Sequence, residues 1–169
     1  AGKIDPLPED KTLRLDQAQA GLDFATAGLE TLQGAMDMAA ESSHNVVLSF
    51  EAGSDVSRNL AHLEAGNQRI SSMIETLEYT YVPDFAIQKK RDLLEVLEMT
   101  QTHLAHLESL SSSGPDLSER EKARVRALPS EYEKRVYSKG DEVRRNLIDL
   151  KLYFQHEIES IGRSPSSAG

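Results

Sequence analysis

The sequence predicts an all-α protein: an elongated antiparallel bundle of about four long helices plus one short helix, with coiled-coil-like packing. Apolar residues recur every three or four positions along most of the 169 residues, and no stretch keeps the apolar–polar alternation of a strand. Aromatic residues make up only 5% of the chain and Trp is absent, which suits helices with narrow apolar faces. Short segments rich in Pro, Gly and Ser separate the periodic stretches, so successive helices are expected to run antiparallel.

One domain is expected to hold the whole core. The chain has the length of a single domain, and the helical periodicity extends over residues 12–162. Residues 1–11 contain two prolines and no periodicity, which predicts an extended N-terminal arm. The Ser-rich residues 163–169 are predicted to be a disordered tail.

The first helix is predicted from a heptad repeat that begins near Leu13 and continues for five heptads. Such a repeat places two apolar positions on one face of a long helix and favours coiled-coil packing. One of these positions is occupied by Leu15, Leu22, Leu29, Met36, Ser43 and Phe50, and the other by Ala18, Ala25, Leu32, Ala39 and Val46.

Two further heptad positions give the first helix its character. An acidic stripe, which is expected to face solvent or a basic partner, consists of Asp16, Asp23, Glu30 and Asp37. A small-residue flank consists of Gly21, Gly28, Ala35, Ser42 and Ser49. Because Gly costs about 1 kcal/mol in a helix, the repeated small residues indicate that another helix approaches closely. That helix belongs either to this chain, which we favour, or to a partner; a weak, mobile helix is the remaining interpretation.

Two more long helices are predicted between residues 54 and 112. Gly53 is a plausible stop for the first helix, and Ser54 or Asp55 can cap the second. The apolar seam of the second helix is interrupted at Asn67, which either lies buried and fixes register, faces a partner or lies in solvent. The Val-Pro-Asp sequence at 82–84 ends this helix, and its Asp is expected to cap the third.

The C-terminal third is predicted to contain one short and one long helix. Ser118 and Glu121 match the capping box that begins a helix, and Pro129 is expected to end this short basic helix, 118–128. The last helix is predicted from about residue 130 to 162, with a kink where Gly140 interrupts the apolar seam.

The sequence contains no convincing metal or catalytic motif. Di-iron bundles use two Glu-x-x-His repeats, but only Glu41 and His44 match this pattern. His103 and His106 share a helical face, yet zinc normally requires at least three protein ligands. Cys is absent, and neither a nucleophile elbow nor a Gly-rich phosphate loop is present. We therefore expect no cofactor and no enzymatic activity.

The charge distribution limits the classes of partner. The chain carries a net charge of −9, with −11 in residues 1–117 and +2 in residues 118–169. This balance disfavours nucleic acid and anionic membrane surfaces. There is also no apolar run near the 18 residues that predict a membrane span, so no direct membrane insertion of these residues is expected. Two basic clusters either offset the acidic helix or dock an acidic segment: Lys89, Lys90 and Arg91, and Arg120, Lys122, Arg124 and Arg126.

The expected function is a non-enzymatic protein–protein interaction or assembly module, such as an adaptor, scaffold or secretion-related bundle, whose partner is another protein or a second copy. The alternative is the extracytoplasmic sensor domain of a bacterial receptor, which binds a small ligand between its helices. The composition assigns no cellular compartment. The candidate partner-binding residues are Asp16, Asp23, Glu30, Asp37, Lys89, Lys90, Arg91, Arg120 and Arg124.

Overall fold

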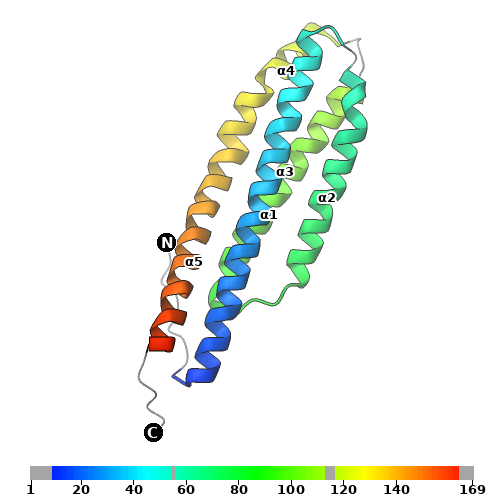
Figure 1. Cartoon of the computed structure of the whole chain (residues 1–169). Coiled ribbons are helices and arrows are strands. Elements are labelled where there is room, and N and C mark those ends of the chain that lie inside the picture. The colour runs from blue at the N-terminus through cyan, green and yellow to red at the C-terminus, as the bar shows by residue number, and fades with distance from the viewer. Residues whose placement is uncertain (1–8, 55, 113–116, 164–169) are drawn as a thin grey trace.

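The computed structural model describes residues 9–54, 56–112 and 117–163, and its helices form the expected all-α bundle (Figure 1). Long helices pack along one another, and the described residues contain no strand. None of these helices is long and apolar enough to cross a membrane. The elements are α1 (Lys11–Glu51), a 3₁₀ turn (Val56–Asn59), α2 (Leu60–Tyr79), a second 3₁₀ turn (Asp84–Ala86), α3 (Ile87–Ser112), α4 (Glu119–Tyr132), a π-helical segment (Glu133–Tyr137) and α5 (Ser138–Arg163).

Helix α1 is the centre of the bundle. It packs most extensively against α5 and also along α3 and α4, whereas α2 packs mainly against α3 and touches α1 much less. Figure 1 shows α5 and α2 on opposite sides of α1, with the start of α1 and the end of α5 at the same end of the molecule. An ion pair between Arg14 and Glu157 joins these two ends.

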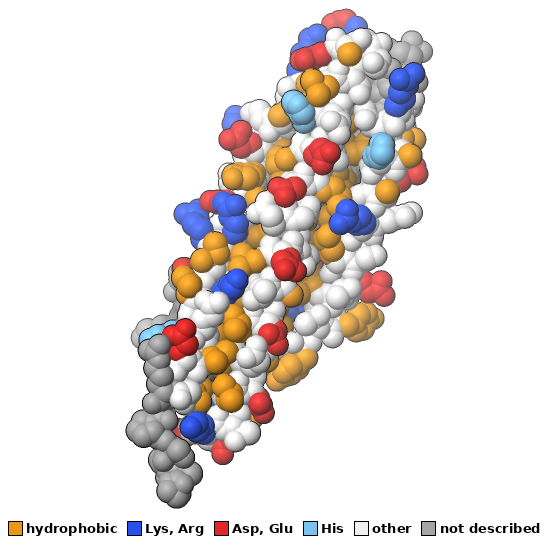
Figure 2. All heavy atoms as spheres, in the orientation of Figure 1, with side chains coloured by type: hydrophobic (Ala, Val, Ile, Leu, Met, Phe, Trp, Pro, Cys, Tyr) orange, Lys and Arg blue, Asp and Glu red, His pale blue; other side chains and the backbone are white. Residues whose placement is uncertain are grey.

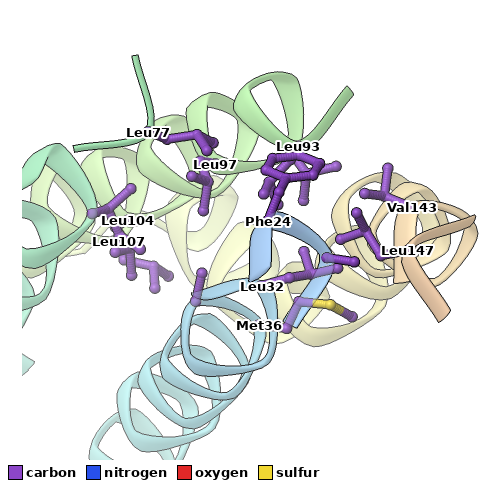
Figure 3. Close-up of a cluster of buried hydrophobic side chains, with 14 of the residues drawn as sticks. Phe24, Leu32, Met36, Leu77, Leu93, Leu97, Leu104, Leu107, Val143 and Leu147 are labelled. Atoms are coloured by element: carbon purple, nitrogen blue, oxygen red, sulfur yellow. The ribbon is translucent and has the colours of Figure 1, made fainter. Parts of the chain in front are cut away.

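The core face of α1 is turned toward the small-residue flank. The heptad position of Ala18, Ala25 and Leu32 is fully buried along the helix, whereas Leu15 is 39% exposed and Leu22 is half-buried. The leucines that the repeat marks most strongly therefore lie at the edge of the core. Figure 3 shows Phe24, Leu32 and Met36 of α1 between the leucines of α3 and the Val143 and Leu147 side chains of α5.

The first three members of the small-residue flank, Gly21, Gly28 and Ala35, are buried within the chain, as we favoured, whereas Ser42 and Ser49 are half-buried. A Cβ atom at Gly21 would overlap the ring of Phe154, and one at Gly28 would lie 3.3 Å from Leu93 Cδ2 and 3.4 Å from Leu147 Cδ1. The Phe154 ring is fully buried, with the ring of Phe85 5.1 Å away. Gly21 therefore admits α5 at a distance that no larger residue allows, and Gly28 is tightly packed against α3 and α5.

The ends of the helices follow local chemistry in three places and depart from it in two. Asp10 accepts a hydrogen bond from the Leu13 amide at 2.9 Å and caps α1. Gly53 adopts φ 70°, which ends α1, and Ser118 and Glu121 form the predicted capping box. The predicted cap at Ser54 is not observed, because a 3₁₀ turn precedes α2; Asp55 lies outside the described residues. The prediction that Asp84 caps the third helix is also wrong, because Asp84 lies inside a 3₁₀ turn.

The prediction that Pro129 ends a short helix is wrong. Helix α4 continues through Pro129 into the π segment and α5 without a break. The amide of Ser138 bonds to the Glu133 carbonyl five residues earlier, which is the wider turn of a π-helix. Gly140 is required by packing, since a Cβ atom there would lie 2.8 Å from Met36 Sδ.

The contrast between two glycines of α1 tests this packing. We expect Gly21→Ala to destabilise the fold by about 1–3 kcal/mol, because the buried Phe154 ring cannot move aside without disturbing its neighbours. Gly34→Ala should stabilise by about 0.5–1 kcal/mol, because a Cβ atom there meets only Met73 Cε at 3.9 Å and the helix gains propensity. Urea unfolding measures both changes; equal effects at the two positions would contradict the close α1–α5 contact.

Candidate functional site

The described part of the chain contains a groove between α1 and α2, which we call the α1–α2 groove. The two helices approach closely near Gly66, where a Cβ atom would lie 2.9 Å from Met38 Sδ. Toward the start of α1 they leave a cavity of about 570 Å³. This volume lies within the range of about 300–1,000 Å³ that ligand pockets occupy.

The groove has an apolar floor and walls of small residues. Phe24 and Leu77 lie at its floor, 4% and 8% exposed respectively, together with the buried Gly28. The remaining lining residues are Ala20, Asp23, Ala27 and Thr31 of α1 and Ser72, Met73, Thr76, Thr80 and Tyr81 on the α2 side. Tyr81, at the open end, is 78% exposed. Small residues on both walls leave room for a bulky guest that covers the floor.

The acidic stripe runs beside this groove. All four residues of the stripe are exposed, and Asp23 itself lines the groove. Figure 2 shows acidic side chains spaced along α1 in this view. The carboxylates of Asp23 and Asp37 accept hydrogen bonds from Gln19 and Gln33, at 2.9 and 2.8 Å. Among the described residues, no ion pair engages any member of the stripe.

The first basic cluster lies at the end of the bundle where α3 begins, and part of it has a structural role. Lys90 Nζ donates to the carbonyls of Glu78 and Thr80, at 2.9 and 3.0 Å. These carbonyls are at the C-terminal end of α2, where a cation is favoured. Lys89 is half-buried, and Arg91 is exposed beside a cavity of about 450 Å³.

The second basic cluster lies at the other end of the bundle, where α4 begins (Figure 1). Arg120 and Arg124 are exposed, Lys122 pairs with Glu119 at 3.1 Å, and Arg126 lies 5.3 Å from the ring centre of Phe50. The structure therefore does not bring the two basic clusters together. The second cluster is separate from the α1–α2 groove, whereas the first adjoins one end of it, because Thr80 and Tyr81 line both the groove and the cavity beside Lys90 and Arg91. The nine candidate partner-binding residues therefore do not form one site.

A buried polar cluster lies where α1, α3 and α4 meet, and sequence reasoning missed it. His103 Nε2 lies 2.6 Å from Ser43 Oγ, and its ring centre is 5.1 Å from that of Tyr132. Ser43 Oγ also donates to the Ala39 carbonyl at 2.9 Å, and Tyr132 donates to the Met36 carbonyl at 2.8 Å. A signal was present, since Ser43 stands where the heptad repeat otherwise places a large apolar residue.

The protonation state of this cluster follows from its hydrogen bonds. The hydroxyl of Ser43 has one proton, which goes to the Ala39 carbonyl, so we assign the shared proton to His103 Nε2. Burial lowers the pKa of His103 to about 4, and nearby His106 adds to this effect. Burial likewise raises the pKa of Tyr132 to about 12. At neutral pH, both side chains are therefore uncharged and hydrogen-bonded.

This geometry does not fit a serine nucleophile. A nucleophilic serine must be reached by its substrate, but Ser43 is 1% exposed and its hydroxyl already bonds to the Ala39 carbonyl. His106 is exposed and takes no part in this hydrogen bond. Within the described ranges, no group of three or more His, Cys, Asp or Glu side chains is placed to hold a metal ion. The Ser43–His103 contact is best explained as a structural hydrogen bond.

Asn67, the polar residue in the seam of α2, is half-buried. Its Nδ2 donates to Glu108 of α3 at 3.3 Å, while its Oδ1 is buried without a hydrogen-bond partner. This supports the interpretation that Asn67 sets the register between α2 and α3, because a shifted register would lose its contact with Glu108.

Comparison of the chain with protein-family models, curated proteins and solved structures finds no match.

The lowered pKa of His103 makes a prediction about stability and pH. In the unfolded chain this imidazole takes up a proton below pH about 6.5, whereas in the folded protein it stays neutral until about pH 4. Its contribution to stability is therefore complete above pH about 6.5 and is lost as the pH falls toward 4. His103→Gln should flatten this part of the stability profile, measured by urea unfolding at stepped pH. His62→Gln, on the exposed face of α2, is the control; identical profiles for wild type and His103→Gln would contradict the assignment.

Proposed function

We propose that this protein is a non-enzymatic interaction module that binds an amphipathic helix of a partner protein in the α1–α2 groove. The observation that carries the proposal is the groove itself: an apolar floor left open between two helices that pack against the rest of the bundle. A helix laid into such a groove inserts residues spaced three and four apart. An adaptor or scaffold works by this kind of docking.

The dimensions of the groove favour a helix as its occupant. The α1 residues that line it extend from Ala20 to Thr31, a rise of about 16 Å or three helical turns. Ala20 and Ala27 on one wall and Ser72 and Thr76 on the other are small, and small residues permit helices to approach closely. The exposed Tyr81 supplies an aromatic contact at one end, a residue type enriched at interfaces.

Charge favours a helix with a basic flank. The α1 wall carries Asp23, and the other members of the acidic stripe follow at one-heptad intervals. These carboxylates have no ion-pair partner within the described residues, so a guest with Lys or Arg along one side gains new pairs. Such pairs mainly determine specificity and the rate of association.

A bacterial sensor domain that binds a small ligand between helices is the second candidate, and the volume of the groove also favours it. A sensor domain of this kind needs its first and last helices to end together, as α1 and α5 do. However, any antiparallel bundle with an even number of long helices brings its ends together in this way. The position of the helix ends therefore does not distinguish the two functions. They are distinguished by whether the groove binds a helix or a small molecule.

Synthetic helical peptides test the proposal. Three peptides share one apolar stripe at positions i, i+3, i+4 and i+7 and differ in carrying lysine, glutamate or glutamine along the flank. Fluorescence anisotropy should rank the lysine peptide first, with an affinity that falls as salt increases. Ala27→Phe fills the groove from an exposed position and should reduce binding at least tenfold.

The matched control is Ala105→Phe, an exposed alanine of α3 outside the groove, which should leave peptide binding unchanged. Equal binding of the lysine and glutamate peptides would refute the charge argument. The ligand sensor would be favoured instead if none of the three peptides bound while small apolar dyes did, and if Ala27→Phe abolished the binding of those dyes.

A further inference from the structure

We propose that a second copy of this chain docks on the face formed by α1 and α5, in a symmetric dimer that places α1 of each copy over α5 of the other. This face lies on the side of α1 away from the α1–α2 groove. The proposal therefore goes beyond helix binding and does not depend on it.

An apolar strip follows the line where α1 and α5 meet. On α1 it consists of Leu15, which is 39% exposed, and the half-buried Leu22 and Leu29. On α5, the half-buried Lys151 and Arg144 lie next to these leucines, four and three residues from the buried Leu147, whereas the exposed Ile148 and Leu152 lie one step farther from α1. The three leucines form the apolar strip and lie beside the core without entering it, because the core face of α1 is turned toward the small-residue flank. Figure 2 shows hydrophobic side chains along this line.

Opposite charges flank the two sides of the strip. The acidic stripe is next to the leucines on α1, and Figure 2 shows basic side chains over α5 on the other side. Arg144 and Arg145 share Asp141 as an ion-pair partner, whereas no described ion pair engages Lys151. Each copy thus offers an acidic edge, an apolar centre and a partly compensated basic edge.

The contacts within one chain fix how α1 and α5 are aligned. Gly21 meets Phe154, Gly28 meets Leu147, and Met36 meets Gly140, so each step up α1 corresponds to one step down α5. By this alignment, Asp23 lies at the level of residues 151 and 152. Glu30 lies at the level of residue 145. The acidic and basic edges are therefore in register along the strip.

A twofold axis parallel to the helices uses this register. Rotation about such an axis brings α5 of the second copy over α1 at the same level, so that each acidic edge meets a basic edge. Asp23 of each copy then faces Lys151 of the other, and Glu30 faces Arg144 and Arg145. A twofold axis perpendicular to the helices would instead place one acidic stripe over the other, which like-charge repulsion disfavours.

Charge exchange between copies tests the dimer. The wild-type chain should self-associate in sedimentation equilibrium between micromolar and near-millimolar concentrations, because the apolar strip is narrow for a stable interface. Asp23→Lys and Lys151→Glu should each weaken self-association at least tenfold. An equimolar mixture of the two variants should recover it, because both Asp23–Lys151 contacts of the mixed dimer again join opposite charges. A contact within one chain cannot produce this recovery.

The control Glu64→Lys makes the same charge change as Asp23→Lys at an exposed position of α2 and should leave association unchanged. Leu15→Asp, at the exposed end of the strip, should weaken association at least tenfold, while circular dichroism verifies that each variant keeps its helix content. A wild-type chain that stays monomeric overturns the proposal. So does a mixture that fails to associate, or equal losses for Asp23→Lys and Glu64→Lys.

Discussion

The close contact between the glycines of α1 and the side chains of α5 is the constraint on which the rest of the bundle depends. Because Gly21 admits the ring of Phe154 and Gly28 admits Leu147, the small-residue flank becomes part of the core. This turns α1 about its axis, so that the leucines at 15, 22 and 29 move to the edge of the core. Both proposed binding surfaces follow from this orientation, one on each side of the acidic stripe.

Local rules predicted a large part of the fold. The acidic stripe is exposed as expected, and Gly53 and the Ser118–Glu121 capping box lie at helix ends, because these features depend on neighbours within one or two turns. Which heptad position would be buried was harder to predict, since leucine marks one position and alanine the other. The leucine position lies at the edge of the core and the alanine position is buried, because the neighbouring glycines allow a closer approach by α5.

The features that sequence reasoning missed depend on residues far apart in the chain. Ser43 and His103 are 60 positions apart in the sequence. The residues around each of them therefore do not indicate that the two side chains form a hydrogen bond in the core. Similarly, the α1–α2 groove exists because α2 packs mainly against α3 and only little against α1. The apolar periodicity of α2 does not indicate which of these two helices it will pack against. The exposure of the acidic stripe was predictable, but the separation of the two basic clusters to opposite ends of the bundle was not.

The π segment after Pro129 limits which insertions and deletions the chain can tolerate between α4 and α5. Buried residues of α4 and α5 follow one another in steps of four at Leu128, Tyr132, Val136 and Gly140, a spacing longer than the average helical turn. The wider turn absorbs this excess and lets one continuous helix serve two differently oriented seams. Loss of a single residue here would rotate α5 by about 100° relative to α4. Leu147 and Phe154 would then no longer contact Gly28 and Gly21. The number of residues in the π segment is therefore constrained by contacts that the segment itself does not make.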